Sequence, residues 1–153
     1  MNNDVGDILK GKVVIVGIGN ILRGDDGIGP ALIERLQGTV KAVCIDAGTV
    51  PESYTGKITK EQPDTILFID ALHLDRSAGE YAVLGKDDIV KSGFTTHDIS
   101  PAMVIEYLEC QTHADIYLLG IQPQNLSLGD EISEPVKKTL THVEQLLKEV
   151  LNA

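Results

Sequence analysis

Hydrophobic runs about as long as a β-strand recur along the chain, and segments with helical periodicity or turn residues separate them. These runs span residues 12–18, 40–46, 65–70, 80–84 and 115–121. Their nearly unbroken Val, Ile and Leu content is typical of strands covered on both faces, so the pattern predicts a mostly parallel sheet. The run at 80–84 follows the previous one with little room for a crossover helix, which predicts an antiparallel or edge strand.

Helical periodicity predicts three helices between and after these strands, over residues 27–37, 101–111 and 134–151. The last has one apolar stripe, formed by Val136, Leu140, Val143, Leu147 and Val150. Ser100 and Ser133 each stand next to or near a proline and are predicted to cap the helices that follow. The segment 51–62 is ambiguous, because Gly56 weakens a helix prediction there.

This order of elements predicts the α/β class, as a three-layer α/β/α sandwich around a mostly parallel, twisted, five-stranded sheet. We expect a single domain over residues 1–153, with its core at about 12–150. If the second and third strands flank the first on opposite sides, a crevice opens where the strand order reverses. Residues at the carboxyl ends of the first and third strands would meet there.

Charge and composition narrow the class of function. The chain has 13 basic and 23 acidic residues and a net charge of -10, which argues against nucleic-acid binding. Its amino-terminal residues lack the basic and apolar regions of a secretory signal, and its apolar runs are too short to span a bilayer. Cys44 and Cys110 give no disulfide framework and are predicted to be buried thiols, so we expect a cytoplasmic protein.

The most informative segment is the glycine-rich turn at 17–29, between the first strand and the first long helix. It fails the dinucleotide fingerprint, because Leu22 stands where the third glycine should be, and the chain has no phosphate-binding Gly-Lys-Ser or Gly-Lys-Thr loop. Asp46, at the end of the second strand, is a weak candidate for a ribose-binding acid. Two acids in such a turn favour a cation or an acid/base site instead.

These acids, Asp25 and Asp26, precede the predicted helix, where a carboxylate can cap free N–H groups and interact favourably with the helix dipole. Capping explains only one of them, because adjacent side chains point apart. We therefore assign the capping role to Asp25 and a functional role to Asp26.

Asp70 and His97 complete the candidate site. Asp70 ends the third strand, and His97 lies in a polar loop before a helix. Two carboxylates and one imidazole suit Ni, Zn, Fe or Mn and leave coordination positions open. The remaining histidines are expected to be structural or exposed: His73, His113 and His142.

Five blocks, in order, give the chain a specific resemblance. They are Gly17-Ile18-Gly19-Asn20 with Gly24-Asp25-Asp26-Gly27-Ile28-Gly29, Asp46-Ala47-Gly48-Thr49 with Pro51-Glu52, Ile69-Asp70-Ala71, Thr95-Thr96-His97, and Leu119-Gly120-Ile121-Gln122-Pro123. Over about residues 12–150 the chain resembles the [NiFe]-hydrogenase maturation endopeptidases, especially the type that processes the large subunit of hydrogenase 3. The resemblance implies a nearly parallel five-stranded sheet between helices.

It also implies a protease that removes the C-terminal extension of a [NiFe]-hydrogenase large-subunit precursor after nickel insertion. The family's metal-binding positions correspond to Asp26, Asp70 and His97. The nickel would arrive on the precursor, held by its cysteines, rather than reside on the enzyme. Asp26 and Asp70 would orient that metal and contribute to activating water.

Two alternatives stay open. Asp26 and Asp70 can be a metal-free aspartic dyad sharing one proton, as like charges at close range require. The same fold can also serve as a noncatalytic chaperone that binds nickel or the precursor.

Overall fold

Five strands form one sheet in the order β2-β1-β3-β5-β4, in the computed structural model that describes residues 5–92 and 101–152. All neighbouring pairs are parallel except β4 and β5, which are antiparallel. The strands are β1 (Val13–Ile18), β2 (Val43–Gly48), β3 (Thr65–Ala71), β4 (Tyr81–Leu84) and β5 (Asp115–Ile121). The predicted fold class is confirmed, including the antiparallel edge strand and the reversal of strand order at β1.

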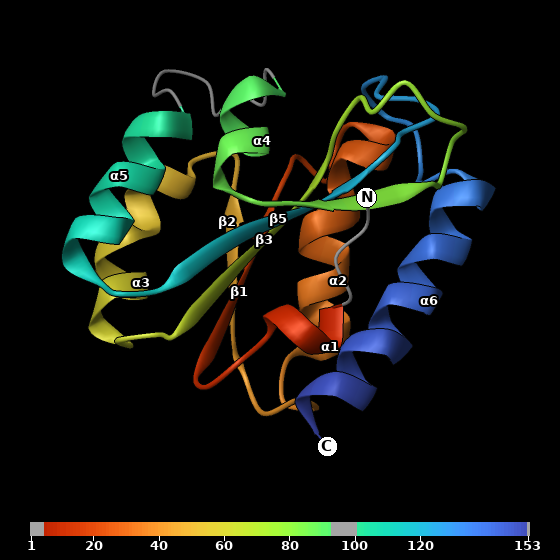
Figure 1. The fold of residues 1–153 in the computed structure, drawn as a ribbon. Coiled ribbons are helices and arrows are strands. Elements are labelled where there is room, and N and C mark those ends of the chain that lie inside the picture. The colour runs from red at the N-terminus through yellow and green to blue at the C-terminus, as the bar shows by residue number, and fades with distance from the viewer. Residues whose placement is uncertain (1–4, 93–100, 153) are drawn as a thin grey trace.

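Helices cover both faces of the sheet (Figure 1). On one face lie α1 (Val5–Ile8), α2 (Ile28–Leu36) and α6 (Glu134–Leu151); on the other lie α3 (Thr55–Lys60), α4 (Lys86–Lys91) and α5 (Pro101–Gln111). Two 3-10 turns, η1 (Gly24–Gly27) and η2 (Pro51–Tyr54), precede α2 and α3.

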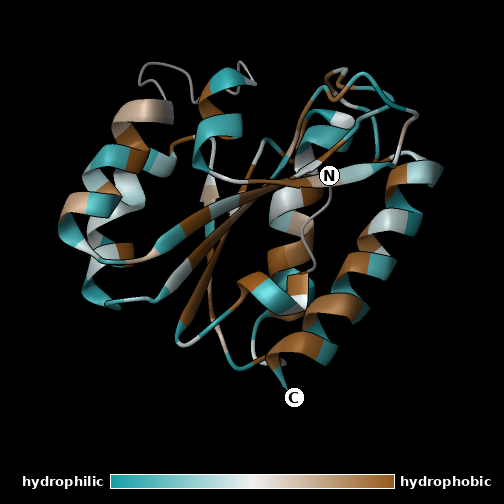
Figure 2. Cartoon of the chain, in the orientation of Figure 1, coloured by the Kyte–Doolittle hydropathy of each residue, from teal (hydrophilic) through white to brown (hydrophobic). Residues whose placement is uncertain are grey.

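The core consists of two apolar layers, one on each side of the sheet. Alternate residues of one strand serve both layers: Val13 and Ile15 face the α2 and α6 side, whereas Val14 and Val16 face the α3 and α5 side. All four are buried, and most of the length of the central strands is coloured as hydrophobic (Figure 2). This two-sided burial explains why the sequence shows continuous rather than alternating apolar runs.

Some boundaries differ from the sequence predictions. The second strand begins at Val43 rather than residue 40, and the ambiguous segment 51–62 resolves into η2 followed by the short α3. The helices α1 and α4 were not predicted, because four or six residues are too few for a periodic pattern.

The prediction that both cysteines are buried was wrong for Cys110, which lies on the exposed face of α5. Cys44 is partly buried.

The start of α2 lies unusually close to β1 and β3, and Gly29 is the residue that permits it. A Cβ atom on Gly29 would lie 2.6 Å from the Ile69 carbonyl oxygen and would also overlap the backbone of Ile18. Gly19, with φ at +147°, is equally constrained, since a Cβ there would collide with the carbonyl oxygen of Asp26. These contacts hold η1 against the carboxyl ends of both strands.

We predict that Gly29→Ala destabilises the protein by about 3 kcal/mol, because the added methyl meets backbone atoms that cannot move aside. The matched control is Gly56→Ala in α3, where a Cβ meets nothing within 4 Å and should stabilise by about 0.5–1 kcal/mol. Urea unfolding of both variants measures the difference. Equal midpoints for the two variants would show that the close approach is not required.

Candidate functional site

Asp26 and Asp70 come together at the switch point of the sheet, as predicted. Asp26 lies in η1, which follows β1, and Asp70 lies near the carboxyl end of the neighbouring β3. The two carboxylates are close enough for the charge of Asp26 to affect the ionisation of Asp70. Residues 44 positions apart in the chain thus share one edge of the sheet.

Asp26 is fixed by its own loop. The Asn20 backbone N–H donates to Asp26 Oδ2 at 3.0 Å, and the Asn20 side-chain oxygen accepts from the Leu22 N–H at 2.9 Å. The Asp26 N–H donates in turn to the Arg23 carbonyl oxygen. This short network explains the asparagine in the turn, because Asn20 shapes the loop that presents Asp26.

Asp70 is the more deeply buried acid, with 7% of its surface exposed. Its Oδ1 accepts a hydrogen bond of 2.8 Å from the Ala71 N–H. Burial and the nearby charge of Asp26 raise the pKa of Asp70 well above its usual range, against the opposing effect of that hydrogen bond. Asp70 therefore holds a proton at a higher pH than an exposed aspartate does.

The third predicted ligand, His97, lies outside the described residues. Among residues 5–92 and 101–152 no group of three or more His, Cys, Asp or Glu side chains is arranged to hold a metal ion. Asp26 and Asp70 thus supply a pair of carboxylates, and a complete ligand set requires a group from elsewhere. Carboxylate oxygens are ligands that nickel and zinc accept.

Asp25 has a structural role, but it does not cap a helix as predicted. It is fully buried, and its carboxylate accepts four hydrogen bonds from the segment 124–133. The donors are the backbone N–H groups of Gln124, Asn125 and Ser133 and the hydroxyl of Ser133. The predicted cap by Ser133 is therefore also wrong, because its hydroxyl is committed to Asp25 rather than to α6.

Gln122 is a buried residue that organises the same edge of the sheet, and no role was predicted for it from the sequence. Its Oε1 accepts from the Leu74 N–H at 2.6 Å, and its Nε2 lies 3.4 Å from His73 Nδ1. It fixes the loop that follows Asp70. The only feature of the sequence that pointed to Gln122 was its place in the Leu119–Pro123 block.

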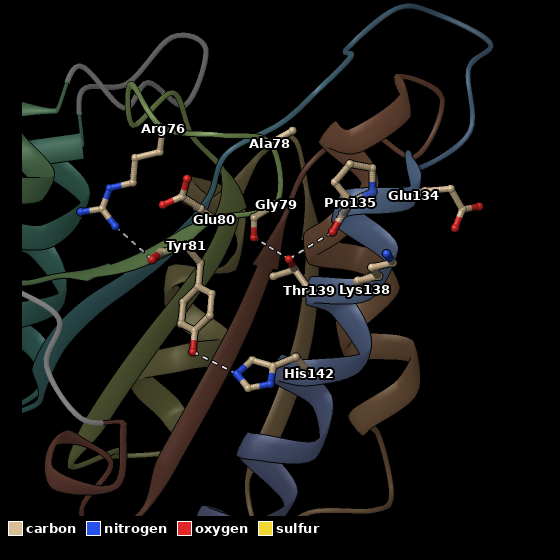
Figure 3. Close-up of a pocket in the computed structure, with 10 residues that line it drawn as sticks. All are labelled: Arg76, Ala78, Gly79, Glu80, Tyr81, Glu134, Pro135, Lys138, Thr139 and His142. Atoms are coloured by element: carbon tan, nitrogen blue, oxygen red, sulfur yellow. Dashed lines mark hydrogen bonds between the residues drawn. The ribbon is translucent and has the colours of Figure 1, made fainter.

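Other polar residues lie apart from the paired acids. Asp46 is exposed, and its Oδ1 accepts from the Gly48 N–H at 3.0 Å. A groove of about 660 Å³ lies between the loop before β4 and the first half of α6 (Figure 3). Within it, the Tyr81 hydroxyl lies 3.3 Å from Nε2 of the exposed His142. Neither Asp26 nor Asp70 lines this groove.

The fold and this site define a class: an α/β/α protein with two interacting carboxylates at its topological switch point. The sequence matches the hydrogenase maturation protease family HycI over residues 30–152. The chain belongs to this family of peptidases, as the resemblance implied.

Relatives agree with this assignment. A putative hydrogenase maturation protease of Methanocaldococcus jannaschii is 36% identical, covering 82% of this chain and 80% of its own. The hydrogenase 3 maturation protease of Escherichia coli K12 is 31% identical, covering 88% of each chain.

Solved structures are also similar. The HycI maturation protease of Thermococcus kodakarensis KOD1 superposes with a TM-score of 0.89 at 34% identity, covering 97% of this chain and 99% of its own. The endopeptidase HybD of E. coli, at 22% identity, shares the fold with a TM-score of 0.73, covering 93% of this chain and 91% of its own. No helix in the described part of the chain has the length and apolar character needed to cross a membrane.

We predict that the same substitution destabilises the protein much more at Asp25 than at Asp26. Asp25→Asn places an amide NH2 among N–H donors and should lower the free energy of unfolding by about 3 kcal/mol. Asp26→Asn, at a partly exposed position with one backbone hydrogen bond, should change it by less than about 1 kcal/mol. Chemical denaturation of both variants measures this. A larger loss for Asp26→Asn would contradict the assignment of roles.

The raised pKa of Asp70 leads us to predict that the stability of the protein depends on pH. Because its pKa is raised in the folded protein, the folded state holds a proton that the unfolded chain releases above about pH 4. Stability contributed by that proton is therefore lost as the pH rises from about 4 through the folded-state pKa. Asp70→Asn, which cannot ionise, should gain stability relative to the natural protein over this range. Thermal unfolding between pH 4 and 8 measures the difference.

The control for this experiment is Asp115→Asn, the same change at an exposed position on the opposite edge of the sheet. It should show no comparable increase with pH. If Asp70→Asn followed the natural protein in parallel at every pH, Asp70 would have an ordinary pKa.

Proposed function

We propose that this protein is an endopeptidase that removes the C-terminal extension of a [NiFe]-hydrogenase large-subunit precursor after nickel insertion. The observation that carries the proposal is the convergence of Asp26 and Asp70 in a chain of the HycI family. In each carboxylate a backbone amide fixes one oxygen, and no hydrogen bond from the described residues holds the other. One oxygen of each carboxylate thus has no hydrogen bond from the described residues and could accept a metal.

The ligand is the nickel that the precursor itself carries. Asp26, Asp70 and His97 would bind it as oxygen and nitrogen donors, so only a precursor that already holds the metal is positioned for cleavage. The nickel is then part of the substrate, and the enzyme requires no resident metal. A weak ligand set on the protease suits this role, because the metal has to leave with the mature subunit.

Hydrolysis needs a water molecule at the scissile carbonyl. An ionised carboxylate accepts a proton from that water as it attacks, the C–N bond breaks, and the leaving amine takes up a proton. Asp26 is the more exposed acid and the better placed to meet water, whereas Asp70 retains its proton to higher pH. Nickel carried by the precursor would supply Lewis-acid polarisation of a bound water or of the carbonyl.

The raised pKa of Asp70 also favours a second candidate, a metal-free aspartic dyad in which the two acids share one proton. Both candidates are endopeptidases and use the same two residues. They differ in whether the precursor must carry nickel.

The test compares purified precursor with and without nickel, incubated with the protein and followed by intact mass. We expect the nickel-containing precursor to lose its C-terminal peptide and the nickel-free precursor to stay whole. Asp26→Asn and Asp70→Asn should each slow cleavage by about 100-fold or more, and Asp115→Asn should not. Equal cleavage of both precursors would favour the dyad, and full processing by Asp70→Asn would favour a noncatalytic chaperone.

A further inference from the structure

Two loops beside the site expose large aliphatic side chains to solvent. Ile21 and Leu22, in the loop after β1, are 70% and 61% exposed, and Leu128, in the loop after β5, is 67% exposed. A single exposed leucine needs no explanation, but three on two adjoining loops form a patch. We call the residues 20–24 and 124–131 the twin-loop surface.

The twin-loop surface is rigidly built. The Gly129 N–H donates to the Leu22 carbonyl oxygen at 2.8 Å, and the Gly24 N–H donates to the Asp130 carbonyl oxygen at 3.1 Å. The buried Asp25 carboxylate then anchors the second loop on both sides. It accepts from the N–H groups of Gln124 and Asn125 at the start of the loop, and from the N–H and hydroxyl of Ser133 just after it. The backbone of both loops is therefore restrained before a partner binds, which lowers the entropy lost in ordering the loops.

The twin-loop surface adjoins the candidate catalytic acid. Asn20, its first residue, donates its backbone N–H to Asp26 Oδ2. The Arg23 carbonyl oxygen accepts from the Asp26 backbone N–H. A partner that covers Ile21 and Leu22 therefore binds only four or five residues along the chain from Asp26.

Charge indicates what kind of partner fits. Asp130 and Glu131 belong to the second loop, and with Glu34 and Asp46 they line a hollow of about 510 Å³ that Ile21 also borders. Within the described residues none of these four acids forms an ion pair, and Arg23 is the basic residue in the first loop. A segment with aliphatic side chains and lysine or arginine complements this surface.

We propose that the twin-loop surface is the docking site for an apolar and basic segment of the hydrogenase precursor, separate from the nickel and the scissile bond. This inference rests on the proposed function. Docking on these loops would supply binding energy away from the reacting groups, so the precursor would be recognised by its surface as well as by its metal.

The experiment measures cleavage of purified nickel-containing precursor by the natural protein and by the double variant Leu22→Ser/Leu128→Ser. We expect kcat/KM to fall at least 10-fold and kcat at saturating precursor to stay within about twofold, because the catalytic acids are untouched. The matched control is Val90→Ser on α4, which removes an exposed valine on the other side of the sheet and should leave both constants unchanged. Unchanged thermal unfolding verifies that the double variant is folded.

A second arm tests the charge. Asp130→Asn/Glu131→Gln should raise KM and weaken its dependence on salt concentration, since fewer charges then attract the basic segment. Unaltered kcat/KM in both double variants would overturn the docking proposal. So would a dimer of the natural protein, seen by sedimentation, that the Leu22→Ser/Leu128→Ser change dissociates.

The outcome separates this inference from the proposed function. If the natural protein cleaves the precursor and the double variants cleave it equally well, only the docking site is wrong. If the natural protein cleaves nothing, the proposed function fails. Direct binding of the purified precursor to the natural protein and to the Leu22→Ser/Leu128→Ser variant then decides on the docking site: weaker binding by the variant supports it, and equal binding overturns it.

Discussion

The close contact between the η1–α2 segment and the ends of β1 and β3 is the constraint on which the site depends. Gly29 lets the helix start touch the backbone of both strands, and Gly19 makes room for the carbonyl oxygen of Asp26. With side chains at these positions, η1 would be displaced from the sheet. Asp26 would then move away from Asp70, which the end of β3 holds in a buried position.

The neighbouring acids Asp25 and Asp26 have different roles in the same turn. Asp25 is buried and joins η1 to the segment after β5, where its four hydrogen bonds compensate for the desolvation of its charge. Asp26 is partly exposed and lies close enough to Asp70 for its charge to raise the pKa of Asp70. The structural acid therefore holds in place both the catalytic candidate and the loops that we infer receive the precursor.

Much of this arrangement could be predicted from the sequence, for identifiable reasons. The buried strands give unmistakable apolar runs, and parallel topology brings Asp26 and Asp70 to one edge of the sheet. The partners of Asp25 and Ser133 could not be predicted, because the hydrogen bonds join residues 108 positions apart. Short helices such as α4 have too few residues for periodicity, and Gln122 acts through loop contacts that no local pattern shows.

The central claim is that the two carboxylates meet a metal that another protein carries. Nickel-edge X-ray absorption of the nickel-containing precursor, frozen with the protease before turnover, tests it most directly. The account predicts that oxygen or nitrogen ligands join the sulfur ligands of the precursor, and that this light-atom contribution falls with Asp70→Asn. Nickel coordination that is identical with and without the protease would contradict the account.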